Sequence, residues 1–361
     1  MDKARKKFPV LRQYIYANTA GFGLLSEDLL EWRQEHDLDF LLKASAMRSI
    51  SVSIIKDTRQ AVSTMFHCKP ANVALVSNFS LGINMLLNSF KKGTKILVLE
   101  DDYPSVRWPL DTREFTVVSI PITSTLEADI KKTIAAENIE VLALSLVQWV
   151  NGVKINLDFL KELKQTNPEV FVIADGTQFC GTTNFNFESS GIDVLGASAY
   201  KWMLSGYGNG FLLFKDSVQE KLNVPITGFY AADADEENKE KIPFAKKFEP
   251  GHLSCLVFGS LKFSIEAMQQ WGVDAIEKQL ITLASNAKEE FTKLGLLEDM
   301  VVARKEHSSI FNIKGGNALY DHLTQNGVVC SQRANGIRIS FHFYNTLKDV
   351  KAIVEILKSF S

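Results

Sequence analysis

The sequence contains little cysteine for its length, only four residues among 361. Cys68, Cys180, Cys255 and Cys330 lie far apart, and none of them forms the paired spacing that indicates a metal site. We therefore expect no bound metal. We also expect all four thiols to be reduced, as is usual in a cytoplasmic protein.

Charge of one sign and long apolar runs are scarce as well. A formal net charge of -2 offers no basic surface for nucleic acid or for an anionic membrane. The basic residues from Lys3 to Lys7 are not followed by an apolar run long enough for a signal peptide or a membrane span. Repeats and low-complexity tracts are also missing. These absences favour a cytoplasmic globular protein that binds neither nucleic acid nor membrane.

What the sequence does contain is an alternation of apolar strands and helical segments. The short, almost wholly apolar runs lie at residues 73–76, 95–99, 115–120, 141–144, 171–174, 194–197 and 211–214. Strands that are apolar on both faces and alternate with helices indicate a mainly parallel sheet with helices on both sides. We therefore expect an α/β fold with a sheet of the seven-stranded type.

The C-terminal part of the chain has a different pattern. A long amphipathic helix is predicted from Leu256 to Leu294, followed by a strand, a helix, a strand and a final helix. We expect a large domain at residues 15–255 and a small α+β domain at residues 256–361, with residues 1–14 packing on the small domain. Such a pair places a cleft at the carboxyl ends of the parallel strands.

Lys201 follows one of the apolar strands and has hydroxyl groups beside it. Ser198 and Tyr200 precede it, and a glycine-rich turn follows. Because strand 194–197 is small and buried, we expect the ammonium group to be desolvated, which lowers its pKa and suits a Schiff-base nucleophile. Ser198 and Tyr200 could donate hydrogen bonds to a phosphate. The alternative is a strand–turn–strand hairpin with a surface lysine.

Asp175 closes the apolar strand 171–174, earlier in the chain than Lys201. Pyridoxal 5'-phosphate (PLP) is an aldehyde cofactor that needs a lysine amine and a carboxylate at its ring nitrogen. Gln178, in the same segment, can reach the phenolic oxygen of such a ring. Taken alone, Asp175 would be interpreted as a helix cap. Together with Lys201 it indicates a PLP site.

Three further segments give weaker indications. Ser77-Asn78-Phe79-Ser80 lies between a strand and a helix, where a hydroxyl and free N–H groups form an anion site, although such residues are usually only caps. Tyr103 could lie flat on a planar cofactor or could simply belong to a Tyr-Pro turn. Arg338 lies inside an apolar strand and suits a substrate carboxylate, with a structural ion pair as the alternative.

Together these motifs resemble the class V aminotransferase family of fold type I PLP enzymes, which includes cysteine desulfurases, selenocysteine lyases, kynureninase and isopenicillin N epimerase. The resemblance covers nearly the whole chain, from Asn18 to Thr346. It implies that Lys201 forms the internal aldimine and that Asp175 and Gln178 contact the pyridine nitrogen and the phenolic oxygen. It also implies that Arg338 binds the substrate carboxylate, with Asn18 as a second substrate-binding residue.

The same resemblance implies the remaining cofactor contacts. The Phe79 backbone and Ser80 match the phosphate-binding turn, and Tyr103 matches the stacking position. Ser198, Tyr200 and Lys201 match a Ser-x-His-Lys pattern, with Tyr in place of His as in kynureninase. His252 belongs to a segment that reaches the phosphate of the neighbouring subunit's cofactor, which implies a homodimer with shared active sites.

Two departures from the family pattern matter. Desulfurases carry a reactive cysteine on a loop between the positions of Arg333 and Arg338, and here Ala334-Asn335-Gly336-Ile337 join them without a cysteine. Cys330 comes before Arg333 and is predicted to be a strand residue. Trp149 stands where desulfurases place an asparagine beside the phenolic oxygen, and its indole could donate a hydrogen bond or merely pack.

We therefore expect a cytoplasmic, homodimeric PLP enzyme that acts on a small amino acid with a free carboxylate. Aminotransferase-type chemistry is the first expectation. The alternative is a lyase (selenocysteine lyase, kynureninase-like or another C–S or C–C β-lyase) or an amino-acid epimerase, without a persulfide-forming cysteine. A PLP-binding protein without turnover and a purely structural protein are further alternatives, against which the set of Lys201, Asp175 and Arg338 argues.

Overall fold

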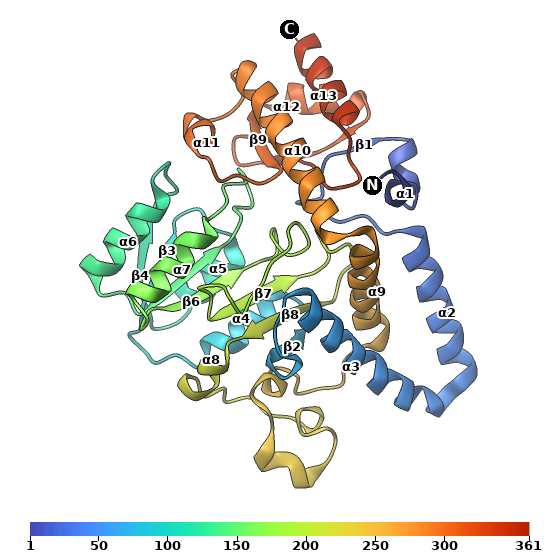
Figure 1. Ribbon diagram of the computed structural model, residues 1–361, viewed down its shortest axis with the longest axis vertical. Helices are drawn as coiled ribbons and strands as arrows, with labels where there is room; N and C mark the ends of the chain where they lie inside the picture. Colours follow the sequence, from blue (N-terminus) through green and yellow to red (C-terminus); the bar gives the residue numbers. More distant parts are fainter. Residues whose placement is uncertain (361) are drawn as a thin grey trace.

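A seven-stranded sheet forms the centre of the protein, in a computed structural model that describes residues 1–360 (Figure 1). Its strand order is β2-β8-β7-β6-β5-β3-β4. The strands are β2 (Val73–Val76), β3 (Lys95–Leu99), β4 (Thr116–Ile120), β5 (Val141–Ser145), β6 (Phe171–Asp175), β7 (Val194–Ser198) and β8 (Gly210–Phe214). Six strands share one direction, and β8 runs antiparallel to both of its neighbours, β2 and β7. The predicted mainly parallel sheet is confirmed.

Helices cover both faces of this sheet because alternate strand residues point to opposite sides. One face packs on α4 (Phe79–Leu87) and α5 (Pro104–Asp111), with Ala74, Ile96 and Leu212 among the strand residues. The other face carries Leu75, Leu97 and Leu213. It packs on α3 (Met47–Met65), α6 (Leu126–Glu137), α7 (Leu157–Thr166) and α9 (Cys255–Trp271). The strands were predicted to be covered on both faces because their residues are almost all apolar, and the structure confirms this.

A smaller layer lies at one end of the molecule, around the three-stranded antiparallel sheet β11-β12-β9. Its strands are β9 (Ile310–Lys314), β11 (Ser331–Arg333) and β12 (Gly336–Ser340). Its helices are α10 (Val273–Lys293), α11 (Asp299–Ala303), α12 (Asn317–Gln325) and α13 (Leu347–Ser359). The division of the chain at residues 255 and 256 stays a prediction.

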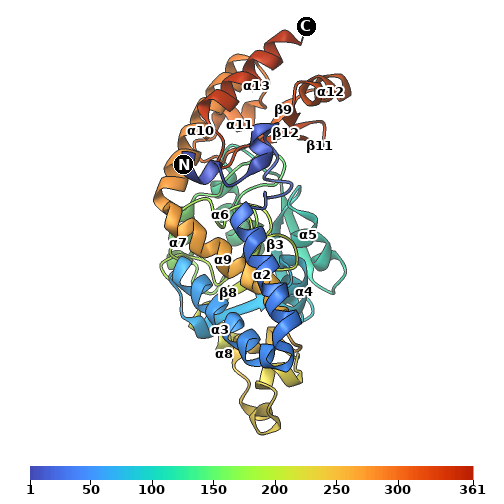
Figure 2. The same ribbon diagram turned by 90° about the vertical axis from the view of Figure 1, so that its right-hand side faces the viewer.

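The start of the chain lies against this smaller layer. Strand β1 (Ile15–Tyr16) pairs in parallel with β10 (Val328–Val329). Arg5, in α1 (Asp2–Arg5), donates to the Asp349 carboxylate of α13 at 2.9 Å. The two ends of the chain are thus joined in this layer. From here the chain continues into α2 (Glu27–Lys43), which runs along the outside of the molecule (Figures 1 and 2).

The single long helix predicted from Leu256 to Leu294 is wrong. The chain forms two helices there, α9 and α10, which are separated by Gly272. Gly272 has a φ of 87°, in a region that a residue with a Cβ rarely adopts and that ends a right-handed helix. The apolar spacing continues across the break, so the pattern alone does not reveal it. The short helix α8 (Asp216–Lys221) completes the helices of the large layer.

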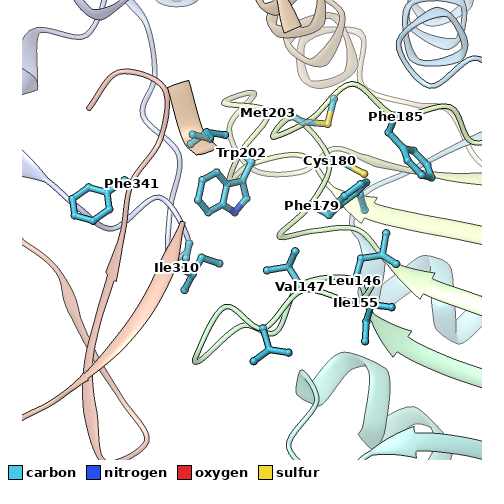
Figure 3. Packing of buried hydrophobic residues seen from close by; sticks show 14 of the residues in the cluster. Leu146, Val147, Ile155, Phe179, Cys180, Phe185, Trp202, Met203, Ile310 and Phe341 are labelled. Carbon is cyan, nitrogen blue, oxygen red and sulfur yellow. The ribbon is translucent and has the colours of Figure 1, made fainter. Parts of the chain in front are cut away.

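The two layers are joined by apolar packing and by one ion pair. Figure 3 shows Trp202, from the loop after β7, between Ile310 and Phe341 of the small layer and Val147 of the large one. Arg304 binds the Glu127 carboxylate through two nitrogens, at 2.7 and 3.0 Å. The arginine side chain is only 3% exposed, so this pair is shielded from solvent on one side. Apolar contacts and this ion pair thus hold the two layers together.

Within residues 1–360, no helix combines the length and the apolar character that crossing a membrane requires. The same part of the chain holds no group of three or more His, Cys, Asp or Glu side chains arranged to bind a metal ion.

Candidate active site

A cavity of about 600 Å³ opens where β7 ends and β8 begins, at the edge of the sheet. Parallel strands bring their carboxyl ends to one edge, so the polar residues that follow β2, β3, β6 and β7 meet there. The cavity is lined by Ser77, Asn78, Phe79, Ser80, Leu81, Tyr103, Thr177, Ser198, Tyr200, Lys201, Tyr207 and Gly208. The predicted residues Phe79, Ser80, Tyr103, Ser198, Tyr200 and Lys201 are thus brought together in one cavity.

Lys201 is 5% exposed, and its Nζ lies between two aromatic rings. The ring centroids of Tyr103 and Tyr200 are 5.3 and 5.4 Å from Nζ. No carboxylate in the described chain lies within ion-pair distance of this amine. Burial, with the nearby charge of Arg338, lowers the pKa of Lys201 to about 8, although Asp175 opposes the shift. The lysine is therefore buried, as the sequence predicted, and it loses its proton at a lower pH than an ordinary lysine does.

The backbone of Lys201 is held by a close approach of the N-terminal segment. The Gly23 N–H donates to the Tyr200 carbonyl oxygen at 3.1 Å. A Cβ at Gly23 would stand 2.0 Å from the Lys201 carbonyl oxygen, which leaves room only for glycine. This contact fixes the direction in which the lysine side chain leaves the strand end.

Asp175 is the last residue of β6 and is 4% exposed. The Thr177 N–H donates to its Oδ1 at 2.8 Å, and no lysine or arginine within residues 1–360 forms an ion pair with it. Burial raises the pKa of Asp175 to about 6, while the Thr177 hydrogen bonds and the Lys201 charge oppose the rise. A buried carboxylate without a cationic partner suits a ligand that brings a positive charge, such as a protonated ring nitrogen.

Hydroxyl groups gather at the N-terminus of α4, on the other side of the cavity. The Phe79 N–H donates to Ser198 Oγ at 2.9 Å, and the hydroxyls of Ser80 and Ser105 are 2.6 Å apart. The Asn78 side chain caps the helix by accepting from the Leu81 N–H at 2.9 Å. Hydroxyls rotate freely, so this set of donors can turn toward an anion at the helix N-terminus. Together with Lys201 and Asp175, the residues fit the phosphate, aldehyde and ring nitrogen of PLP.

Gln178 and Trp149 bind protein groups instead of pointing freely into this cavity. Gln178 donates to the Ala20 carbonyl oxygen at 3.0 Å and accepts from the Trp202 indole at 2.6 Å. The Trp149 indole donates to the Asp101 carbonyl oxygen at 3.3 Å, and its ring meets Tyr103 edge-on at 5.7 Å. The contacts predicted for both residues with the phenolic oxygen stay predictions.

Arg338 is 2% exposed and lies next to this group of aromatic residues. One guanidinium nitrogen donates to the Trp149 carbonyl oxygen at 2.7 Å, and Nε has no partner. Burial and the charge of Arg333 lower the pKa of Arg338 to about 10. The structural ion pair considered as the alternative is not formed with any acid of the described chain. Asn18 forms an isolated parallel β-bridge with Ser340. Its side-chain Oδ1 is buried and has no hydrogen-bond partner within residues 1–360.

His252 lies elsewhere in the chain's own fold. It is exposed, its ring lies 5.0 Å from that of Tyr230, and it lines a separate cavity of about 680 Å³ beside α2 and α3. The segment before it is anchored by Glu249, which accepts from Arg59 through both oxygens at 2.7 Å and from the Leu75 N–H at 2.7 Å. The structure therefore holds His252 at the surface, on a fixed segment.

Sequence reasoning assigned no role to three residues of this region. The Thr177 N–H donates to the Asp175 carboxylate, and the Thr177 Oγ1 accepts from the Ser198 N–H at 3.1 Å. Its place two residues after Asp175, in Asp175-Gly176-Thr177-Gln178, is a local signal for a hydrogen bond to that carboxylate. Ser105 contacts Ser80, and Arg333 acts electrostatically on Lys201 and Arg338. These two depend on contacts between distant strand ends, for which a single sequence holds no local signal.

Comparisons with known proteins place this chain in a family. The family model described as Aminotransferase class-V matches residues 43–353. Isopenicillin N epimerase from Amycolatopsis lactamdurans is 22% identical, and the match covers 84% of this chain and 84% of that protein. A probable cysteine desulfurase from Pyrococcus abyssi is also 22% identical, over 99% of this chain and 96% of that protein.

Two solved structures with similar folds cover nearly the whole chain. The apo structure of cysteine desulfurase from Thermococcus onnurineus NA1 superposes with a TM-score of 0.86 at 18% identity, covering 99% of this chain and 97% of that chain. A mutant of C-DES with glycine covalently linked to its PLP cofactor superposes with a TM-score of 0.87 at 17% identity, covering 99% of both chains. At 17 and 18% identity, these similarities show a shared fold only.

Proposed function

The chain belongs to the class V aminotransferase family, whose cofactor is PLP, and from this premise we propose an enzyme that transfers the amino group of a small amino acid. One observation carries the proposal. A buried amine, Lys201, and a buried carboxylate, Asp175, meet at one sheet edge, and neither forms an ion pair with another described side chain. Two such groups are what PLP requires at its aldehyde and at its ring nitrogen.

When bound, PLP supplies a ring that withdraws electrons from the α-carbon of an amino acid. Lys201 would hold the cofactor covalently and, once the substrate amine has replaced it, would move the α-proton at its Nζ. A pKa of about 8 allows this nitrogen to accept and release a proton near neutral pH. Asp175 would keep the ring nitrogen protonated, and Tyr103 would pack against the ring.

The remaining residues would orient the two ligands. The Ser80 and Ser198 hydroxyls would hold the phosphate at the N-terminus of α4, and the Phe79 N–H, which donates to Ser198 Oγ, would orient that hydroxyl. Arg338 would bind the α-carboxylate through the guanidinium positions that no protein group occupies. With the carboxylate held there, the α-hydrogen would be directed at Lys201.

A β-lyase or an epimerase is the second candidate, because proton transfer at the α-carbon by Lys201 begins each of these reactions. A desulfurase that forms an enzyme persulfide is not part of this proposal. Cys330 is 5% exposed, and burial raises its pKa to about 12. Such a thiol stays protonated and is a poor nucleophile.

We also propose a cytoplasmic homodimer in which each subunit completes the other's site. All four cysteines are free thiols, as in a reducing compartment. His252 stands exposed on an anchored segment, at a cavity bordered by α2 and α3. Leu38, Phe40, Leu41 and Leu42 on α2 are between 53 and 77% exposed, which is unusual for a surface that faces only water.

An amino-acid panel tests the reaction type. The purified holoenzyme is incubated with single amino acids, with and without a 2-oxo acid, and the new 2-oxo acid, ammonia, sulfide and the opposite enantiomer are measured. Product that depends on the added 2-oxo acid supports transamination. Ammonia or sulfide released without it identifies a lyase, and enantiomer exchange an epimerase. Lack of every product, with PLP bound, would overturn the enzymatic proposal.

A further inference from the structure

Three buried polar groups without partners stand side by side on one face of the small sheet. Arg338 in β12 is paired directly with Ser331 in β11 and with Asn312 in β9, and residues paired across antiparallel strands share a face. Ser331 Oγ, Arg338 Nε and Asn312 Oδ1 are all buried and unbonded. Native proteins leave few such groups unpaired, so a row of three indicates a polar ligand.

The same face carries a second guanidinium group. Arg333 is half-buried and, since it pairs with Gly336, projects from the same side of the sheet as Arg338. Its side chain donates only to the neighbouring Gln332 carbonyl oxygen, at 2.7 Å, and to no acid of the described chain. Its charge lowers the pKa of both Lys201 and Arg338, which places it in the electrostatic field of the candidate active site.

The candidate active site has more positive than negative side chains on the side where the substrate would bind. Asp175 is the one carboxylate that acts on Lys201, and in the proposed function its charge is matched by the ring nitrogen of the cofactor. Arg338 and Arg333 then remain as two cations. The α-carboxylate of an amino acid offsets only one of them. The second cation calls for a second anionic group on the substrate.

Space for a longer side chain exists beside this face. A cavity of about 460 Å³ between the two layers is lined by Asn312 and Gly336 on one side and by Gln148 and Trp149 on the other. Of its acidic lining residues, Glu100, Asp101 and Glu298 are exposed and therefore screened by water. The fourth, Asp102, is buried and accepts a hydrogen bond from the Ser145 N–H, and its burial raises its pKa and so favours the neutral form. The buried Arg338, paired across the strands with the lining residue Asn312, would attract an anionic side chain toward this face of the small sheet.

We propose that the substrate is an amino acid with an acidic group at the end of its side chain. The α-carboxylate lies on Arg338, and the distal group lies on Arg333 and accepts a hydrogen bond from the Ser331 hydroxyl. The inference rests on the proposed function and deepens it, because it names Arg333 and Ser331 as the residues that determine specificity.

The test measures binding to the cofactor-loaded protein. Its visible absorbance is titrated with L-aspartate and L-glutamate, with their amides L-asparagine and L-glutamine, and with L-alanine. Each acid should bind about tenfold or more tightly than its amide, the effect of a charge-assisted hydrogen bond. Arg333→Gln should remove this preference, Arg333→Lys should restore part of it, and the exposed Arg12→Gln serves as the matched control. The affinity for L-alanine, measured on the same proteins, separates this preference from the general effect of the Arg333 charge on Lys201 and Arg338.

A second readout does not depend on amino-acid chemistry. In calorimetry, succinate should bind more tightly than propionate, and Arg333→Gln should abolish the difference. Equal affinities for acids and amides, unchanged in Arg333→Gln, would overturn the inference while amino-acid binding itself upholds the proposed function. If no amino acid alters the absorbance of protein that contains PLP, the proposed function fails as well.

Discussion

At the scale of single residues, the site depends on two groups whose ionisation the fold has changed. Burial lowers the pKa of Lys201 to about 8 and raises that of Asp175 to about 6. The directions are opposite, but the cause is the same, since burial favours the neutral form of either group. A ligand that brings a positive charge to Asp175 would stabilise its carboxylate again. The two residues are therefore poised for a cofactor that reacts with an amine and carries a basic nitrogen.

Replacing Asp175 by asparagine keeps the shape of the side chain and removes its charge. We expect Asp175→Asn to reduce kcat by about two to three orders of magnitude, a few kcal/mol of barrier. Asp193→Asn is the matched control: Asp193 is also buried, but it lies before β7, where it binds Lys164 at 2.6 Å. Steady-state kinetics with the best substrate of the panel measures both. Near-normal turnover in Asp175→Asn would mean that the carboxylate serves only the local hydrogen bonds with Thr177.

The depressed pKa of Lys201 predicts how the apoprotein captures PLP. Only the neutral amine attacks an aldehyde, so the capture rate should rise about tenfold per pH unit below pH 8 and level off above it. An ordinary lysine would give a rise that continues toward its pKa of 10.5. Stopped-flow absorbance after mixing apoprotein with PLP, between pH 6 and 10, measures the profile. A rate still increasing steeply at pH 10 would contradict a buried, desolvated amine.

At the scale of elements, the hairpin of β11 and β12 decides which chemistry the small layer can contribute. Arg333 pairs with Gly336, so Ala334 and Asn335 alone form the turn, with Ala334 at a φ of 49°. A turn this short cannot carry a thiol into the cavity. Cys330 precedes β11 and is buried, with its pKa raised to about 12 by that burial. The hairpin supplies Arg338 to the site and no nucleophile.

Cys330→Ala should therefore leave the main activity within about twofold of the parent, because an inert thiol contributes only packing. Its stability should fall slightly. Incubation with L-cysteine followed by intact-protein mass spectrometry should show no added sulfur on either protein. Rapid formation of alanine and of a persulfide, lost in Cys330→Ala, would show that this thiol reaches the substrate.

Local elements were predictable from the sequence to different degrees. The apolar runs at β3, β5 and β6 were found almost to the residue, because each is buried on both faces and leaves a continuous signal. The break at Gly272 was missed, because the apolar spacing on its two sides continues in phase. The hydrogen bonds of Gln178 with Ala20 and Trp202 were not predictable, since they join three distant segments.

At the scale of the whole molecule, two layers meet around the site, and one outer face remains apolar. The alternation of strands and helices predicted the large layer, but the cavity between the layers depends on packing such as that of Trp202 (Figure 3). Figures 1 and 2 show α2 and α3 along the outside of the molecule. His252 lines the cavity beside these helices, away from the cavity that contains Lys201. A second subunit on this face would account for both features.

The double variant Leu41→Glu and Leu42→Glu tests this assembly. These side chains are 77 and 72% exposed in one chain, so the charges should not disturb its fold. In a dimer interface they would be buried at a large energetic penalty. We expect sedimentation velocity to show a dimer for the parent and a monomer for the variant, with weaker PLP retention. A monomeric parent that retains PLP fully would contradict shared active sites.

A covalent bond between Lys201 and PLP can be fixed chemically and then located in the sequence. The yellow holoprotein is reduced with borohydride, digested and analysed by mass spectrometry, with Lys201→Ala treated in parallel. We expect the yellow colour to be lost and a phosphopyridoxyl group to be found on the peptide that contains Lys201, and we expect no such label in the variant. A label on another lysine, or a labelled peptide that persists in Lys201→Ala, would contradict it.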